Sequence, residues 1–162
     1  MEIYFLRHGD AGAAEGWKGT DAERPLSAEG TARMQREAEA IARLRPGVDL
    51  ILTSPLVRAR QTAQIVARAL HKEGALVPDD RLAPGFHAGA LARILEDHTS
   101  RAGLMLVGHE PDFSSVIAAC TGGGRIECKK GSLIRVDITG PSLTGVLVWL
   151  LPPRALAPNQ LP

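Results

Sequence analysis

The chain has few cysteines, few aromatic residues and almost no excess charge. Its two cysteines, Cys120 and Cys128, form neither a C-x-x-C pair nor a Cys/His metal-binding spacing. We therefore expect no disulfide framework and a reducing compartment. The formal net charge of +1 provides no broad positive field for nucleic acid or an anionic membrane, so a site for an anionic ligand has to be local.

Long apolar runs are also lacking. The longest, residues 146–151, has the length of a strand and not of a membrane span. Met1-Glu2 leads directly into an apolar stretch, without the basic and then apolar segments of a signal peptide. We therefore expect a cytoplasmic protein with neither a membrane nor a nucleic-acid partner. The length of 162 residues predicts a single domain over residues 1–162, with a tail from about residue 152 lying loosely on its surface.

Short apolar runs alternate with segments of helical spacing along the chain. The runs predict strands, and the spaced segments predict helices after each of the first strands. The strands are expected at residues 3–6, 48–53, 75–77, 103–107, 132–138 and 145–151, and the helices at about 28–44, 54–70, 90–98 and 113–120. This order predicts an α/β fold, a three-layer sandwich with a mostly parallel central sheet and a closing C-terminal strand pair.

Polar residues mark the ends of several predicted elements. Ser27 is a candidate N-cap of the first long helix, and Ser54 with Pro55 predicts a cap and first residue for the second. Gly122-Gly123-Gly124 ends the helix at 113–120, and Gly140-Pro141-Ser142 joins the last two strands.

Arginine and histidine follow three of the predicted strands. Arg7-His8-Gly9 comes directly after the first strand, Arg58 lies in the first turns of the helix after the second, and His109 follows residues 103–107. The carboxyl ends of parallel strands meet at one edge of the sheet, where ligands bind in open α/β folds. We therefore expect two guanidinium groups and two imidazoles to converge there.

This set of side chains suits phosphoryl transfer. His8 would attack phosphorus in line, while Arg7 and Arg58 hold the phosphate oxygens and His109 donates to an oxygen or steadies a phosphohistidine intermediate. Neutral imidazole is nucleophilic without a separate base, and nearby guanidinium groups disfavour its protonation. Gly9 is expected to let the backbone turn sharply beside them.

Several motifs resemble those of the histidine phosphatase superfamily, in the same order along the chain. The motifs are Leu6-Arg7-His8-Gly9-Asp10-Ala11, Arg24-Pro25-Leu26-Ser27, the stretch from Ser54 to Ala63, Val107-Gly108-His109-Glu110-Pro111 and Lys129-Lys130-Gly131-Ser132. They are most similar to the short, SixA-type phosphohistidine phosphatases. The resemblance implies a phosphoglycerate-mutase-like fold, phosphorylation of His8, and a phosphate pocket completed by Arg7, Gly9, Arg58 and His109 with Arg24 at its rim.

The chain departs from larger members of that superfamily in one respect. Those members carry a proton-donating Glu or Asp between the second arginine and the second histidine, where this chain has Arg81. Without that acid, a phosphohistidine substrate is favoured, because imidazole is a weaker base than an alkoxide and leaves more readily. The acid/base candidates, should one be needed, are Asp10, Asp80, His87 and Glu110.

Other interpretations remain open. A small phosphorylated metabolite could be the substrate in place of a phosphohistidine-bearing protein, or the pocket could bind phosphate without catalysis. A metal ion held by His8 and His109 is disfavoured because the arginines would repel a cation, so we expect no metal and no cofactor. Lys129-Lys130 is interpreted as a solvated turn, with contact to a phosphoprotein as the alternative.

Overall fold

A computed structural model describes residues 1–140 and 142–156 of the chain. Within them, six strands form one sheet in the order β3-β2-β4-β1-β5-β6. The strands are β1 (Glu2–Arg7), β2 (Leu50–Thr53), β3 (Leu76–Pro78), β4 (Gly103–Gly108), β5 (Leu133–Thr139) and β6 (Thr144–Leu151). The helices are α1 (Ala28–Arg43), α2 (Val57–Leu70), α3 (Ala88–Asp97), α4 (Asp112–Cys120) and α5 (Pro153–Leu156), with short 3-10 turns η1 (Asp21–Glu23), η2 (Glu73–Ala75) and η3 (Asp80–Leu82).

Strand direction divides the sheet into two parts. β1 pairs with β4, β4 with β2, and β2 with β3, all in parallel. β5 pairs antiparallel with both β1 and β6. This confirms the predicted mostly parallel sheet with a closing strand pair. Pro141 of the predicted final turn lies outside the described residues.

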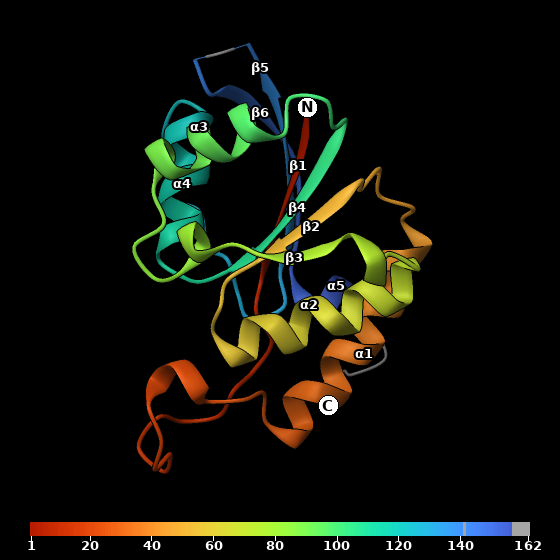
Figure 1. Ribbon diagram of the computed structural model, residues 1–162, viewed down its shortest axis with the longest axis vertical. Coiled ribbons are helices and arrows are strands. Elements are labelled where there is room, and N and C mark those ends of the chain that lie inside the picture. The colour runs from red at the N-terminus through yellow and green to blue at the C-terminus, as the bar shows by residue number, and fades with distance from the viewer. Residues whose placement is uncertain (141, 157–162) are drawn as a thin grey trace.

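Helices cover both faces of the sheet and give each face its own apolar core. α1, α2 and α5 lie on one side of the sheet, and α3 and α4 lie on the other (Figure 1). Successive side chains of β1 point to opposite faces, so Ile3 and Phe5 join the core under α3 and α4, whereas Tyr4 and Leu6 join the core under α1 and α2. β4 is buried throughout because it lies inside the sheet between both layers.

The start of α1 agrees with the sequence analysis. Ser27 is its N-cap, and the Ser27 Oγ accepts a hydrogen bond of 2.9 Å from the Gly30 amide. Gly30 has no room for a larger residue, since a Cβ atom there would come within 2.0 Å of the Asp10 carbonyl oxygen. The first turn of α1 is thereby packed against the chain just beyond His8.

Two predictions about element ends are wrong. α2 begins at Val57 with Leu56 as its N-cap, not at Ser54-Pro55, and the Ser54 side chain instead contacts a histidine of the site described below. The tail is not loose over residues 153–156, because Pro153 and Leu156 are buried and Leu156 belongs to the core beneath α1. Residues 157–162 lie outside the described part. No helix in the described residues is both long and apolar enough to cross a membrane.

Candidate active site

Three of the predicted side chains meet at the carboxyl edge of the parallel strands. His8 follows β1, His109 follows β4, and Arg58 lies in the first turn of α2 after β2. All three are buried, with 4–7% of each residue exposed. The centroids of the two imidazole rings are 5.1 Å apart, and the Arg58 Nε lies 3.3 Å from the His8 Nε2. The predicted convergence is confirmed for these three residues. We call them the pocket floor.

Hydrogen bonding assigns the two nitrogens of His8 different roles. Nδ1 lies 2.7 Å from the carbonyl oxygen of Gly9, which can only accept, so Nδ1 carries the ring proton. Nε2 then presents a lone pair, which receives the Arg58 Nε–H. The ring is thus in the tautomer that a nucleophile acting through Nε2 requires.

Gly9 serves a different purpose from the one predicted. It does not adopt the left-handed conformation that favours glycine. Instead, a Cβ atom at this position would lie 3.3 Å from the Leu26 side chain, so glycine allows close packing there. The Gly9 amide donates to the Thr62 hydroxyl at 3.0 Å, and that hydroxyl donates to the Arg58 carbonyl at 2.8 Å. Thr62 therefore joins the two arginine-bearing motifs.

Ser54 orients His109. The Ser54 Oγ lies 2.7 Å from the His109 Nε2 and also accepts the Leu56 amide hydrogen at 3.3 Å. A hydroxyl can donate one hydrogen bond and accept two, so this contact is compatible with either tautomer of the His109 ring. The His109 Nδ1 is buried and has no hydrogen-bond partner among the described residues. In the tautomer that carries its proton on Nδ1, this atom is a donor available to an anion.

Arg7 presents a second donor of this kind. Its Nη1 donates to the Cys128 carbonyl at 2.7 Å, and its backbone exchanges hydrogen bonds with Gly131 and Ser132. Its Nε is buried and lacks a partner within the described residues. An unpaired buried donor costs free energy unless a ligand satisfies it, so Arg7 and His109 together indicate an anion site.

Both imidazoles are held neutral at physiological pH. The pKa of His8 is lowered to about 3, chiefly by burial and also by the charges of His109, Arg58 and Arg7, against the opposing effect of the Gly9 carbonyl. Burial likewise lowers the pKa of His109 to about 4, with Arg58 and Arg7 in support and with Asp112 and Asp21 opposing. Arg7 thus acts electrostatically on both rings.

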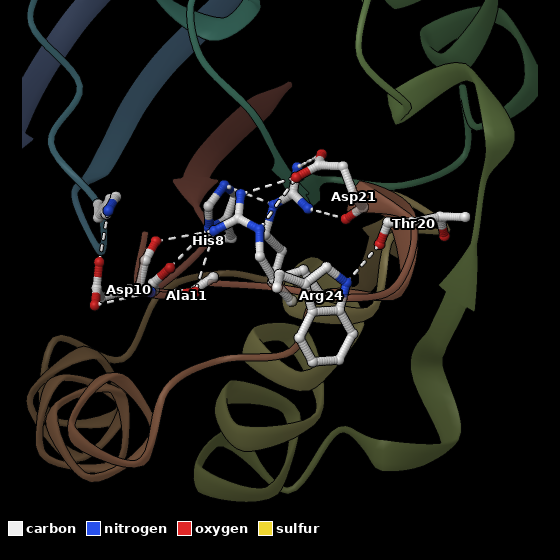
Figure 2. Close-up of polar contacts among 11 residues, drawn as sticks. His8, Asp10, Ala11, Thr20, Asp21 and Arg24 are labelled. Carbon is white, nitrogen blue, oxygen red and sulfur yellow. Dashed lines mark hydrogen bonds and ion pairs between the residues drawn. The ribbon is translucent and has the colours of Figure 1, made fainter. Parts of the chain in front are cut away.

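An exposed segment, residues 12–24, lies beside the pocket floor, and we call it the rim segment. It contains η1, which brings Asp21 to Arg58: the Arg58 Nη2 donates to the Asp21 Oδ2 at 2.9 Å and Nη1 to its carbonyl at 2.7 Å. Figure 2 shows Asp21 and Arg24 of this segment near His8. Asp21 is not among the predicted site residues. The spacing of residues in an irregular segment does not indicate that the segment folds back to the sheet edge.

Arg24 holds the rim segment itself. Its Nε and Nη2 donate to the Asp21 Oδ1 at 3.1 and 2.9 Å, and its Nη1 donates to the carbonyls of Ala11 and Gly12 at 3.1 and 2.9 Å. The predicted location at the rim therefore agrees with the structure. The guanidinium is committed to these partners, so in this arrangement it supports Asp21 and does not face His8.

The four acid/base candidates are directed elsewhere. Asp10 forms an ion pair with Lys130 and accepts from the Gly12 amide and the Ser27 hydroxyl, and its pKa is lowered chiefly by the hydrogen bond from Lys130. Glu110 accepts from the amide and hydroxyl of Ser114. Asp80 and His87 are exposed. Within the described residues, none of the four makes a hydrogen bond or ion pair with the pocket floor.

The two lysines of the Lys129-Lys130 pair have separate contacts. Lys129 lies 3.7 Å from the exposed Glu127, whereas Lys130 reaches Asp10 across the start of the rim segment. Lys130 is thus more than a solvated turn residue. In the described part of the chain, no group of three His, Cys, Asp or Glu residues could hold a metal ion.

Comparison with known proteins identifies the family. Residues 3–84 match the model of the histidine phosphatase superfamily, branch 1. The chain belongs to the histidine phosphatase superfamily. An uncharacterized protein of the cyanobacterium Picosynechococcus is 38% identical over 143 residues, which cover 83% of each chain. The phosphohistidine phosphatase SixA of Escherichia coli is 24% identical over 155 residues, 94% of each chain.

Solved structures of histidine phosphatases show the same fold. The protein histidine phosphatase SixA complexed with tungstate superposes with a TM-score of 0.85 at 23% identity, over 96% of this chain and 99% of that one. A putative alpha-ribazole-5'-P phosphatase from Escherichia coli has a TM-score of 0.73 at 18% identity, over 94% and 98%. The fold is therefore that of a histidine phosphatase, as predicted, and is shared by enzymes named for different substrates.

Proposed function

We propose that this chain is a metal-independent phosphatase that forms a covalent phosphohistidine at His8 and acts on phosphohistidine carried by a protein. The observation that carries the proposal is the arrangement around the His8 Nε2. A lone pair on a neutral ring faces Arg58, while the Arg7 Nε and the His109 Nδ1 are buried nitrogens without hydrogen-bond partners among the described residues. These groups suit a tetrahedral anion bound beside a nucleophile.

The first step transfers phosphorus from one imidazole to another. The Nε2 lone pair of His8 forms a bond to phosphorus, the P–N bond of the substrate breaks, and its electron pair stays on the departing ring nitrogen. A substrate ring protonated on its other nitrogen departs as neutral imidazole. Arg58, Arg7 and His109 stabilise the phosphoryl oxygens during the transfer.

The second step returns the enzyme to its starting state. Water attacks phosphorus, the P–N bond at His8 breaks, and its electron pair returns to Nε2. Both protons of the water leave with the product as dihydrogen phosphate, which then ionises in solution, and Nδ1 keeps its proton toward the Gly9 carbonyl. Neither step needs a proton from the protein.

The lack of an enzyme-derived proton supports phosphohistidine over a phosphate ester. An alkoxide leaving group has to be protonated as its bond breaks, and none of the candidate acids contacts the pocket floor in the described residues. The similarity to SixA, named a phosphohistidine phosphatase, supports the same substrate class. The tungstate in the SixA structure is a tetrahedral oxyanion, in keeping with a phosphate pocket in this fold.

A substrate panel tests the proposal. Phosphate release is measured from a phosphohistidine-bearing protein and from phosphate monoesters, with and without a chelator. We expect kcat/KM to be highest for the phosphohistidine protein and unchanged by chelation. A monoester preferred over the phosphohistidine protein would replace the substrate assignment, and loss of activity on chelation would remove the metal-independent mechanism.

Acid-labile labelling separates catalysis from simple binding. Wild-type protein is mixed with the phosphohistidine substrate and the reaction is quenched in alkali. The enzyme itself is then examined for phosphohistidine. We expect label on the wild type and on His87→Ala, a control that alters an exposed histidine, and none on His8→Ala. A protein that only binds phosphate would leave all three unlabelled.

A small phosphorylated metabolite is the second candidate substrate. It is favoured by the shared fold with the structure named an alpha-ribazole-5'-P phosphatase, an enzyme whose name indicates a phosphate ester. The same panel decides between the two, because an ester substrate requires an acid that the pocket floor does not supply.

A further inference from the structure

The rim segment brings one carboxylate, Asp21, to the edge of the pocket. The Arg58 guanidinium lies between it and the nucleophile: Nε donates to the His8 Nε2, while Nη1 and Nη2 donate to the carbonyl and the carboxylate of Asp21. Asp21 is therefore on the far side of the guanidinium from His8. Figure 2 shows the Asp21 side chain with these contacts, supported by Arg24.

Asp21 is accessible where Arg58 is not. Its side chain is 59% exposed, whereas that of Arg58 is 7% exposed. The carboxylate thus lies at the solvent-exposed edge of the site, next to a buried guanidinium. Arg24 and the Thr20–Glu23 capping box keep η1 in shape, so the position of Asp21 does not depend on Arg58 alone.

Asp21 is an anion at neutral pH. Hydrogen bonds from Arg24 and Arg58 lower the pKa of its carboxyl group. The same charge raises the pKa of His109, so it acts on one of the two imidazoles of the floor. A carboxylate with a lowered pKa is a poor proton donor, and Asp21 therefore does not replace the acid that this chain lacks.

We propose that Asp21 determines specificity by favouring leaving groups that carry a positive charge over those that carry a negative charge. In an in-line transfer the leaving group departs on the side of phosphorus opposite the nucleophile. The His8 Nε2 faces the Arg58 Nε, and the Asp21 carboxylate, paired with Arg24, lies on the other side of the Arg58 guanidinium, so we place Asp21 on the leaving-group side. A phosphoimidazolium ring can donate its free N–H to the carboxylate, which keeps the ring protonated so that it departs as neutral imidazole and not as an imidazolate.

The inference rests on the proposed phosphatase function and adds the selection of its substrate. No proton passes to Asp21: the ring keeps its proton, and the electron pair of the broken P–N bond stays on the other ring nitrogen. The negative charge of Asp21 would repel a substrate that carries a carboxylate next to its phosphate.

The test compares Asp21→Asn with the wild type and with a matched control, Glu23→Gln. Glu23 lies in the same turn, and glutamine can keep the capping-box hydrogen bond to Thr20. The probes are phosphohistidine, p-nitrophenyl phosphate, whose leaving group has no fixed charge, and 3-phosphoglycerate, whose leaving group carries a carboxylate. Circular dichroism and thermal melting establish that each variant is folded.

Each kcat/KM is divided by that for p-nitrophenyl phosphate. In Asp21→Asn, we expect this ratio to fall about tenfold for phosphohistidine and to rise about tenfold for 3-phosphoglycerate, because one negative charge near the leaving group is lost. The basic limb of the pH profile for phosphohistidine should also move to lower pH, because the ring is no longer kept protonated. Glu23→Gln should show none of these changes.

Two results would overturn the inference. Unchanged ratios would show that Asp21 does not sense the leaving group, and an equal loss for all three probes would show that it only positions Arg58. Failure of the proposed function is a separate result: the wild type would then not release phosphate from phosphohistidine, while the ratio of 3-phosphoglycerate to p-nitrophenyl phosphate would still report the effect of Asp21.

Discussion

The pocket floor and the rim segment are held in place by different forces. His8, Arg58 and His109 are buried, and each follows from a strand whose backbone is paired on both sides. Residues 12–23 are almost all exposed, and side-chain hydrogen bonds from Arg24, Trp17 and Thr20 hold them together. Surface hydrogen bonds and ion pairs contribute little stability, so substitutions in the rim segment should lower the free energy of unfolding only slightly. We therefore expect the proposed chemistry to depend on the floor and the proposed selectivity to depend on the rim.

Removing Arg58 should break the floor. We expect Arg58→Ala to lower kcat/KM by a factor that corresponds to about 2–4 kcal/mol of lost transition-state stabilisation. The reason is that the substitution removes the buried hydrogen-bond donors proposed to bind the phosphoryl oxygens. Arg60→Ala is the control, since Arg60 is exposed on the same helix. Steady-state kinetics on the preferred substrate measure both. Equal activity of the two variants would mean that the phosphate binds elsewhere.

Acid should destabilise the floor. The pKa values of His8 and His109 fall from 6.5 to about 3 and about 4 on folding. The unfolded chain therefore takes up protons below pH 6.5 that the folded chain does not, and the stability that is fully present above pH 6.5 is lost as the pH falls toward those values.

Urea unfolding at pH 7 and pH 4 measures this effect. Replacing His8 by Asn should reduce the loss of unfolding free energy between the two pH values by on the order of 2 kcal/mol relative to the wild type. Glu37 acts in the opposite direction in both proteins, because burial raises its pKa to about 7, and so it cancels from the comparison. An identical loss in the two proteins would show that His8 titrates normally in the folded state.

Ser54 should matter less than Arg58 because it acts through His109. Ser54→Ala removes the hydrogen bond that holds the His109 ring, and we expect a loss of kcat/KM that corresponds to about 1–2 kcal/mol. Nitrogen-15 shifts of the His109 ring should show one tautomer in the wild type and a mixture of tautomers in the variant. Ser115→Ala, in the exposed first turn of α4, provides the control.

Removing Arg24 should loosen the rim and leave the floor intact. We expect Arg24→Ala to change the unfolding free energy by less than about 1 kcal/mol, because its partners are largely solvent-exposed. Protease cleavage within residues 12–24 should become faster, while phosphoenzyme still forms at His8. Loss of the phosphoenzyme would mean that Arg24 belongs to the floor.

The floor could be predicted from the sequence because strand ends carry it. His8 and His109 directly follow apolar runs, and Arg58 lies in a predicted helix. These elements place all three residues at one sheet edge regardless of the loop conformations. The roles of these residues in catalysis remain predictions. Arg24 could be placed at the rim only through the family resemblance, since no periodicity covers its segment.

Side-chain direction outside regular elements could not be predicted. Asp10 and Glu110 adjoin the two histidines in sequence, yet Asp10 turns to Lys130 and Glu110 to Ser114. Ser54-Pro55 has the composition of a helix start. In the structure, however, α2 begins later and the Ser54 side chain forms a hydrogen bond with His109. The position of Asp21 depends on how the exposed residues 12–23 fold back to the sheet edge, which local sequence preferences do not specify.

The Thr62 hydroxyl links the two halves of the floor. It accepts from the amide of Gly9 and donates to the carbonyl of Arg58, so it joins α2 to the end of β1 alongside the contact between Arg58 and His8. A local unfolding event that lifts α2 would release both at once. The pocket should then open as one cooperative unit, and the fraction of molecules unable to react at any moment is set by the local stability of α2.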